Sequence, residues 1–152
     1  MTLPRALAGT CLAALLAGAV VFAQPKPPAS PAPLPKMGAT VVTWEALLAT
    51  NPGGKRWQVA QAPTATLDEL EMHVTQVGPG LATHAPHRHH DEEVIIIRQG
   101  TFEVFQDGKI TQAGPGSIVF HSSGSLHNLK NVGDTEGSYH VVKWTSPGAP
   151  KS

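Results

Sequence analysis

The residues best suited to chemistry gather between His87 and Gly100, a stretch that reads HRHHDEEVIIIRQG. On an extended strand successive side chains point to opposite faces, so His87, His89 and Glu93 share one face, and Asp91 lies on the same face between them. Two imidazoles and a carboxylate on one side match the ligands of an open mononuclear metal centre. The stretch therefore predicts a metal site, and it does not indicate what that site acts on.

A second polar stretch runs from Gly116 to Asn131 and contains one more histidine, His127, after the glycine turn at Gly124. Together the two stretches resemble the two sequence motifs of the cupin superfamily. Both spacings are present, which makes the resemblance far more specific than a lone H-x-H. The matching positions are His87, His89, Glu93 and Gly100 in the first motif and Gly116, Gly124, His127 and Asn131 in the second.

Two positions depart from the cupin motifs. Gly80 lies one residue too far upstream of His87, and Ser122 stands where the second motif has a proline. Both positions belong to turns, so the departures affect loop geometry and leave the set of ligands intact.

The resemblance implies an all-β fold, a cupin-type β-barrel of two antiparallel sheets (a jelly roll), with one cupin unit because each motif occurs once. It also implies one divalent transition metal ion inside the barrel, held by His87, His89, Glu93 and His127. Such a ligand set leaves one or two positions of a six-coordinate ion open to water, dioxygen or a chelating substrate. Imidazole and carboxylate suit Fe, Mn, Zn, Ni and Cu, and the sequence does not choose among them.

The other histidines have separate expectations. His121 is the one candidate catalytic residue, as a proton carrier at the mouth of the site, but the favoured expectation for it is a solvent-facing or structural role. His90 follows a ligand candidate directly, so on a regular strand it points away from the metal. His73 and His140 read as barrel histidines with satisfied hydrogen bonds, and the sequence leaves the register of His84 open.

The elements that must position these residues are short strands. β-prone runs separated by turn residues predict strands at 56–62, 67–77, 94–98, 101–106, 109–112, 117–121, 126–130 and 138–145, with a tight hairpin at Asp107-Gly108. Thr43 before WEALLA predicts a short helix with a threonine N-cap, which ends at the Asn51-Pro52-Gly53-Gly54 turn.

The run from Val94 to Ile97 is apolar on both faces of its predicted strand. We therefore expect another sheet of the same chain or a second subunit, as in a homodimer, to cover the outer face. Arg98 has the opposite parity to Glu93 and is expected to point outward. The aromatic candidates for the pocket wall, most of them expected to serve as core packing, are Trp57, Phe102, Phe105, Phe120, Tyr139 and Trp144.

The start of the chain predicts export. Residues 1–23 have an arginine before a short apolar run and small residues around Ala23, as in a cleaved signal peptide, with an N-terminal membrane anchor as the alternative. Residues 24–36 read as a proline-rich linker and residues 37–148 as the single cupin domain. The only cysteine, Cys11, lies in the apolar run, so the mature protein has no thiolate ligand. The expected location is the periplasm or the extracellular space.

The composition narrows the partners. The 11 basic and 11 acidic residues balance, so no electrostatic footprint for nucleic acid or an anionic membrane stands out. We expect a small-molecule substrate or ligand, and no membrane association after signal cleavage. The favoured function is a metal-dependent enzyme, an oxidoreductase of the dioxygenase type acting on a small organic molecule. The alternative is a cupin that binds a metal or small ligand for sensing or storage without turnover.

Overall fold

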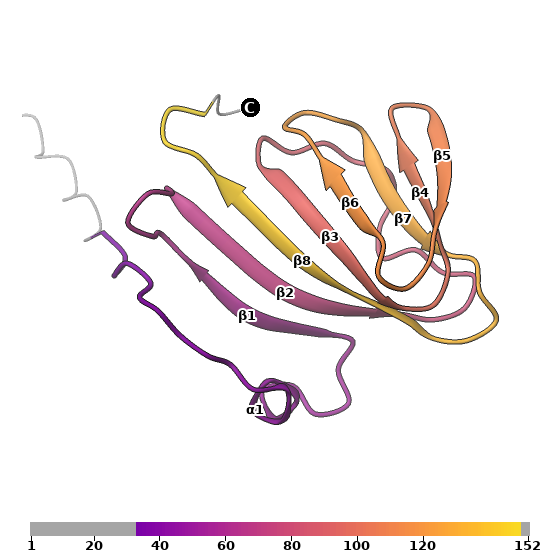
Figure 1. The fold of residues 1–152 in the computed structure, drawn as a ribbon, viewed down its shortest axis with the longest axis horizontal. Coiled ribbons are helices and arrows are strands. Elements are labelled where there is room, and N and C mark those ends of the chain that lie inside the picture. Colours follow the sequence, from indigo (N-terminus) through magenta and orange to yellow (C-terminus); the bar gives the residue numbers. More distant parts are fainter. Residues whose placement is uncertain (1–32, 150–152) are drawn as a thin grey trace, which may run out of the picture. The chain divides into compact units, whose positions relative to one another are not determined.

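A computed structural model of the chain describes residues 33–149, which form one helix and eight strands (Figure 1). Two antiparallel sheets result, with the strand orders β1-β2-β8-β3-β6 and β5-β4-β7. The fold is the all-β jelly roll expected from the sequence, with a short N-terminal helix. In chain order the elements are α1 (Trp44–Ala49), β1 (Arg56–Ala62), β2 (Glu69–Val77), β3 (Glu92–Gln99), β4 (Phe102–Gln106), β5 (Lys109–Ala113), β6 (Ile118–His121), β7 (His127–Asn131) and β8 (Gly137–Thr145).

The hydrophobic core lies between the two sheets. The larger sheet contributes Ile95 and Ile97 of β3, which are 3% and 1% exposed, and the smaller sheet contributes Phe102, Val104 and Leu129. These side chains alternate with outward-facing ones along each strand, as the pleat requires. The core fills one part of the barrel and leaves another part free for polar groups.

The β4–β5 hairpin turns at the position that the sequence predicts. Asp107 and Gly108 have φ values of 45° and 91°, and Gln106 pairs with Lys109 across the turn. Two central residues with positive φ make a two-residue hairpin whose twist matches that of the strands, and Asp-Gly is a favoured pair for it.

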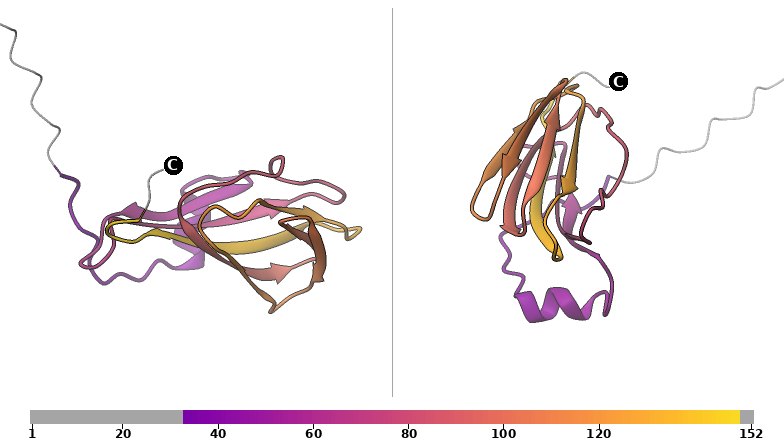
Figure 2. Two further views of the ribbon diagram at one scale, coloured as in Figure 1. Left: turned by 90° about the horizontal axis from the view of Figure 1, so that it is seen from above. Right: turned by 90° about the vertical axis from the view of Figure 1, so that its right-hand side faces the viewer.

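Helix α1 begins at the predicted cap, where the Thr43 side chain accepts a hydrogen bond from the backbone N–H of Ala46. Its Leu47 packs with Trp57 and Val74 in a second apolar cluster, on the face of the larger sheet that points away from the smaller one. Figures 1 and 2 show α1 beside β1, at the edge of the molecule away from β4, β5 and β7. The helix therefore covers mainly the outer face of β1 and β2.

The outer face of β3 is not covered by another sheet among the described residues, so that half of the expectation was wrong. Ile96 is 40% exposed, and its neighbours on β6, Ile118 and Phe120, are 72% and 50% exposed. We call these three residues the outer patch. Arg98 points outward as expected, with its guanidinium 4.3 Å from the ring centre of Trp44.

The expected signal peptide, with Cys11, and most of the expected linker lie outside the described residues. Within residues 33–149, no helix is long and apolar enough to cross a membrane.

Candidate metal centre

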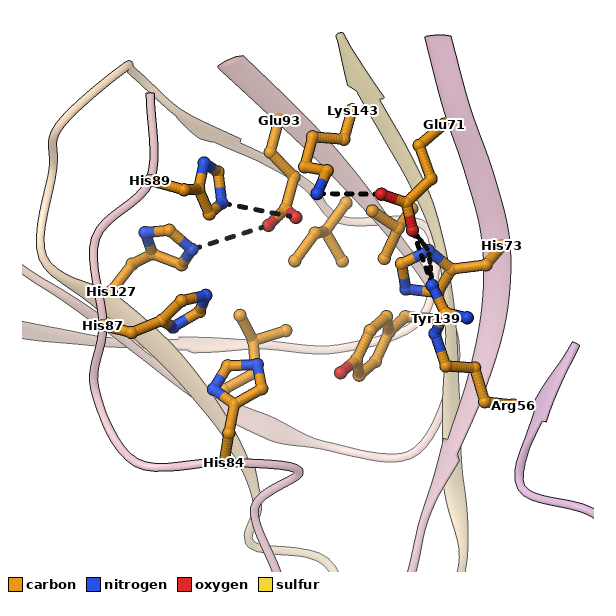
Figure 3. Close-up of a pocket in the computed structure, with 13 residues that line it drawn as sticks. Arg56, Glu71, His73, His84, His87, His89, Glu93, His127, Tyr139 and Lys143 are labelled. Carbon is orange, nitrogen blue, oxygen red and sulfur yellow. Dashed lines mark hydrogen bonds and ion pairs between the residues drawn. The ribbon is translucent and has the colours of Figure 1, made fainter. Parts of the chain in front are cut away.

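The candidate site is a cavity of about 210 Å³ in the part of the barrel that the apolar core leaves free. Figure 3 shows several imidazoles around Glu93 at one end of the cavity and Glu71, His73 and Arg56 at the other, with Lys143 between Glu93 and Glu71. Ile95, Leu129 and Val141 form its apolar wall, and Tyr139 lies beside it. The polar lining residues are Arg56, Glu71, His73, His84, His87, His89, Glu93, His127 and Lys143.

Backbone hydrogen bonds hold two of the expected ligands side by side. The N–H of His87 donates to the carbonyl of His127 at 3.1 Å, and the N–H of His127 donates back at 3.0 Å. This reciprocal pair leaves the two imidazole centres 4.6 Å apart. His87 and His89 therefore precede β3, in the segment that leads from β2 to β3, instead of lying on a strand as the parity argument assumed.

Glu93, at the start of β3, points at the imidazoles. Its Oε1 is 3.8 Å from Nε2 of His127, and its Oε2 is 3.8 Å from Nε2 of His89 (Figure 3). The candidate ligand atoms of His87, His89 and His127 lie within 4.8 Å of one another. The structure thus brings all four expected ligands into one pocket: the three imidazoles form one group of close donor atoms, and Glu93 lies near two of them.

His89 and His127 carry their proton on Nδ1, which leaves Nε2 free to bind a metal. Nδ1 of His89 lies 3.0 Å from the backbone carbonyl of Asp91, and Nδ1 of His127 lies 3.0 Å from that of Ser125. A carbonyl only accepts, so each Nδ1 carries the proton and each Nε2 keeps a free lone pair. Both Nε2 atoms are buried and have no hydrogen-bond partner within residues 33–149, as expected for atoms that await a ligand.

Burial sets the charges around these atoms. It lowers the pKa of His89 and of His127, which keeps both imidazoles neutral and able to bind a metal. It raises the pKa of Glu93 to about 7, against the opposing effect of Lys143. A divalent cation beside Glu93 would compensate this buried carboxylate, because an opposite charge favours the ionised form.

Next to Glu93, the inner face of the larger sheet forms an ionic wall, a network of ion pairs in which Lys143 of β8 lies between Glu93 of β3 and Glu71 of β2. Lys143 Nζ lies 2.8 Å from one oxygen of Glu71, and Arg56 lies 2.6 Å from the other. Although burial raises the pKa of Glu71, the hydrogen bond and charge of Lys143 outweigh it and lower the pKa overall. Burial likewise opposes the charge of Lys143, but Glu71 and Asp91 raise its pKa above the ordinary value. The wall therefore keeps an ammonium group inside the cavity.

His121 lies neither at the mouth of the site, as a proton carrier would, nor facing solvent. It is 0% exposed and sits behind the pocket, with its ring stacked on that of His127 at 4.0 Å between centroids. It belongs to a second group of close donor atoms with Glu93 and His127. A catalytic role for His121 stays a prediction.

The residues that flank the ligands have distinct places. Asp91 shares the parity of Glu93, but it accepts a hydrogen bond from Thr145 and lies 3.6 Å from Lys143. The side chain of His90 is 35% exposed and faces Asp91. His84, left open by the sequence, lines the pocket with its ring 4.2 Å from that of His87.

Among the aromatic candidates, only Tyr139 lines this cavity. Phe102 and Trp57 are core residues, whereas Phe120 and Trp144 stack on each other at 6.5 Å, with Phe120 half exposed.

Sequence reasoning missed the ionic wall of the pocket. Glu71 and His73 were recognised as the polar face of an alternating strand, but nothing indicated that this face points inward. A signal was present: Lys143 has the inward parity of Val141 on β8, and β8 pairs with β2 so that Glu71 lies opposite Lys143. Only the strand pairing makes that signal readable.

Comparisons with known proteins agree with this geometry. Residues 73–143 match the family model of the cupin domain. No curated protein matches the chain significantly. A Cupin 2 conserved barrel domain protein from Salinispora arenicola has a TM-score of 0.53 at 24% identity, over 72% of this chain and 90% of that one.

Two further solved structures have the same fold. KdgF from a Halomonas species has a TM-score of 0.50 at 15% identity, over 62% of this chain and 82% of that one. A sugar phosphate isomerase of the cupin superfamily from Silicibacter pomeroyi has a TM-score of 0.50 at 17% identity, over 61% of each chain. At these identities the likeness shows the fold alone. The family match, which contains both motifs, identifies residues 73–143 as a cupin domain.

Proposed function

We propose that this cupin binds one divalent transition metal ion through His87, His89, Glu93 and His127, and that it is a metal-dependent enzyme acting on a small organic molecule. The observation that carries the proposal is the convergence of these four side chains in one cavity, with the ligand-side nitrogens of His89 and His127 unprotonated and unpartnered within residues 33–149.

The cavity favours a small, anionic substrate. With a metal of charge +2, Lys143 and Arg56 would bring the positive charge to four, against three carboxylates, which leaves one net positive charge for an anionic substrate. The three carboxylates are those of Glu71, Glu93 and Asp91. The cavity volume of about 210 Å³ lies below the roughly 300–1,000 Å³ of pockets that take drug-sized ligands, so a smaller molecule fits it best. Ile95, Leu129 and Val141 would hold its apolar part and exclude water from the reacting end.

The reaction class we favour is oxidation of the dioxygenase type. A metal with open positions can bind a substrate oxygen and dioxygen and polarise them. The chain's own part is to fix three neutral imidazoles and one carboxylate, to keep Lys143 protonated, and to limit entry to small molecules. The alternative function is a cupin that binds a metal or small ligand without turnover. The ion pairs of Glu71 support it, because both carboxylate oxygens are paired and Glu71 is therefore not free to act as an acid or base.

Metal content tests the site directly. We expect His89→Ala and His127→Ala to lower bound metal several-fold in elemental analysis of the purified protein. His90→Ala is the matched control: the same residue type stands next to His89 but faces Asp91. Equal loss in all three variants would overturn the ligand assignment.

Turnover separates the two functions. Metal-loaded protein should convert at least one member of a panel of small diols, catechols and keto acids, with oxygen uptake as the readout. Tight metal retention with inertness toward the whole panel would support the binding function. A chelator should lower the melting temperature in either case, since the metal stabilises only the folded state.

We also propose that a second copy of the chain covers the outer patch of Ile96, Ile118 and Phe120, which gives a homodimer. Three neighbouring apolar side chains that are 40–72% exposed support it. Light scattering should find a dimer, and Ile118→Lys should give a monomer with unchanged metal content. A monomeric unaltered protein would contradict the proposal.

Export to the periplasm or beyond is proposed from residues 1–23 alone. The mass of the protein recovered from its native compartment should correspond to a chain that begins at Gln24; an intact N-terminus would contradict this.

A further inference from the structure

We infer that His121 donates a hydrogen bond from Nε2–H to Glu93 and so positions this carboxylate, and that His121 is not itself a metal ligand. The inference rests on the proposed metal site, because Glu93 is one of its four ligands. The pairing of β3 with β6 puts His121 directly opposite Glu93. Both side chains point into the barrel, where His121 is fully buried and Glu93 is 8% exposed.

Gln106 decides which ring nitrogen of His121 carries the proton. Nε2 of Gln106 donates to the backbone carbonyl of Phe120 at 2.7 Å, and this contact identifies it as the amide nitrogen. The same nitrogen lies 3.0 Å from Nδ1 of His121. An amide nitrogen only donates, so Nδ1 of His121 must accept. In a neutral imidazole the proton is then on Nε2.

The protonated nitrogen faces Glu93. Nε2 of His121 is 4.0 Å from Oε1 of Glu93, and it has no hydrogen-bond partner within residues 33–149. A shift of about 1 Å would bring the two atoms within hydrogen-bond distance. Because Nδ1 accepts from Gln106, the ring of His121 carries one proton only, and that proton is on the nitrogen that faces Glu93.

The three buried imidazoles therefore differ in kind. His89 and His127 present an unprotonated Nε2 to the site, because a backbone carbonyl accepts from each Nδ1. His121 presents Nε2–H, because a donor faces its Nδ1. Its ring is nearly parallel to that of His127, at 16°, which fixes its direction. The N–H can hold Oε1 of Glu93 while Oε2 faces His89.

Two-bond ¹⁵N–¹H correlation spectra of the metal-free protein test the assignment without any substitution. We expect His121 to be protonated on Nε2, and His89 and His127 on Nδ1. In zinc-loaded protein, of these three histidines His89 and His127 should show a metal-bound Nε2, and His121 should not. Protonation of His121 on Nδ1, or zinc on its Nε2, would overturn the inference. The metal-free spectra do not depend on metal binding. A protein that fails to bind zinc would therefore contradict the proposed function, while the protonated nitrogen of His121 would still test the inference.

Substitutions then test the effect on Glu93. His121→Phe keeps a ring but removes the donor, and zinc affinity should fall about 10- to 100-fold. His121→Gln keeps an acceptor for Gln106 and a donor for Glu93, and we expect it to retain most of the affinity. His140→Phe, on the outer face of β8, is the matched control and should change nothing. Unchanged affinity in His121→Phe, or an equal loss in His121→Gln, would contradict a positioning role.

Discussion

At the scale of single residues, the site concentrates groups that are costly to bury without a partner. Glu93 is a carboxyl with its pKa raised to about 7 by burial, among imidazoles that burial keeps neutral. In the metal-free protein its ionised form is destabilising at neutral and higher pH. Glu93 therefore lowers the folding stability of the metal-free protein, and it is suited to binding a metal ion.

This cost predicts a gain in stability on substitution. Glu93→Gln keeps the shape of the side chain and removes the charge, so metal-free protein at pH 8 should be about 1–3 kcal/mol more stable than the unaltered protein. At pH 5 the difference should shrink to less than about 1 kcal/mol, since Glu93 is then protonated in the folded state, and it should vanish only below the ordinary pKa of 4.5. Urea denaturation at both pH values measures this.

The same substitution should remove most of the stabilisation by added metal. Glu103→Gln on β4, a strand that contributes no residue to the pocket lining, is the control and should change neither quantity. A destabilised Glu93→Gln variant at pH 8 would contradict the account of the buried charge.

At the scale of elements, the turn after β3 depends on close contact between two glycines. Gly100 has φ of +89°, and a Cβ added to it would lie 2.7 Å from Cα of Gly137 at the start of β8. Both the backbone conformation and the space therefore require glycine at this motif position.

Gly100→Ala is expected to cost about 2–4 kcal/mol in unfolding free energy, from the strained φ and the displaced neighbour together. Gly114→Ala is the matched control, because an added Cβ there meets no described atom within 4 Å and φ is not positive. The midpoint of urea denaturation should fall for the first variant and stay within a few tenths of a molar for the second. Similar midpoints for the two variants would show that the close contact between Gly100 and Gly137 is not required for stability.

The elements themselves could be predicted because their signals are local. Alternating apolar residues, the Asp107-Gly108 turn and the Thr43 cap each act over a few residues, and the two histidine motifs gave the four candidate ligands. Which face of each strand points into the barrel could not be predicted, because a period of two separates the two faces but does not show which one is buried. Hence Glu71 and Lys143 were missed as a pair, and the position of His121, on a four-residue strand, behind His127 was not predicted.

At the scale of the whole molecule, buried histidines dominate the response to acid. Burial lowers the pKa of His73 to about 4 and that of His121 to about 3, and it lowers those of the candidate ligand imidazoles as well. Between the ordinary histidine value of 6.5 and these folded values, the unfolded chain binds protons that the folded chain does not. Stability is therefore lost as the pH falls through this window.

Glu93 acts in the opposite sense. Its folded pKa of about 7 exceeds the ordinary value of 4.5, so the folded state takes up its proton first and gains stability as the pH falls between the two. One carboxyl opposes several imidazoles, and the imidazoles prevail. We expect metal-free protein to be about 2 kcal/mol or more less stable at pH 5 than at pH 7.5, measured by urea denaturation. In Glu93→Gln the compensating gain is absent, so the loss between these pH values should be larger. A stability that is flat or rises toward pH 5 in the unaltered protein would mean that the buried imidazoles accept protons without opening the barrel.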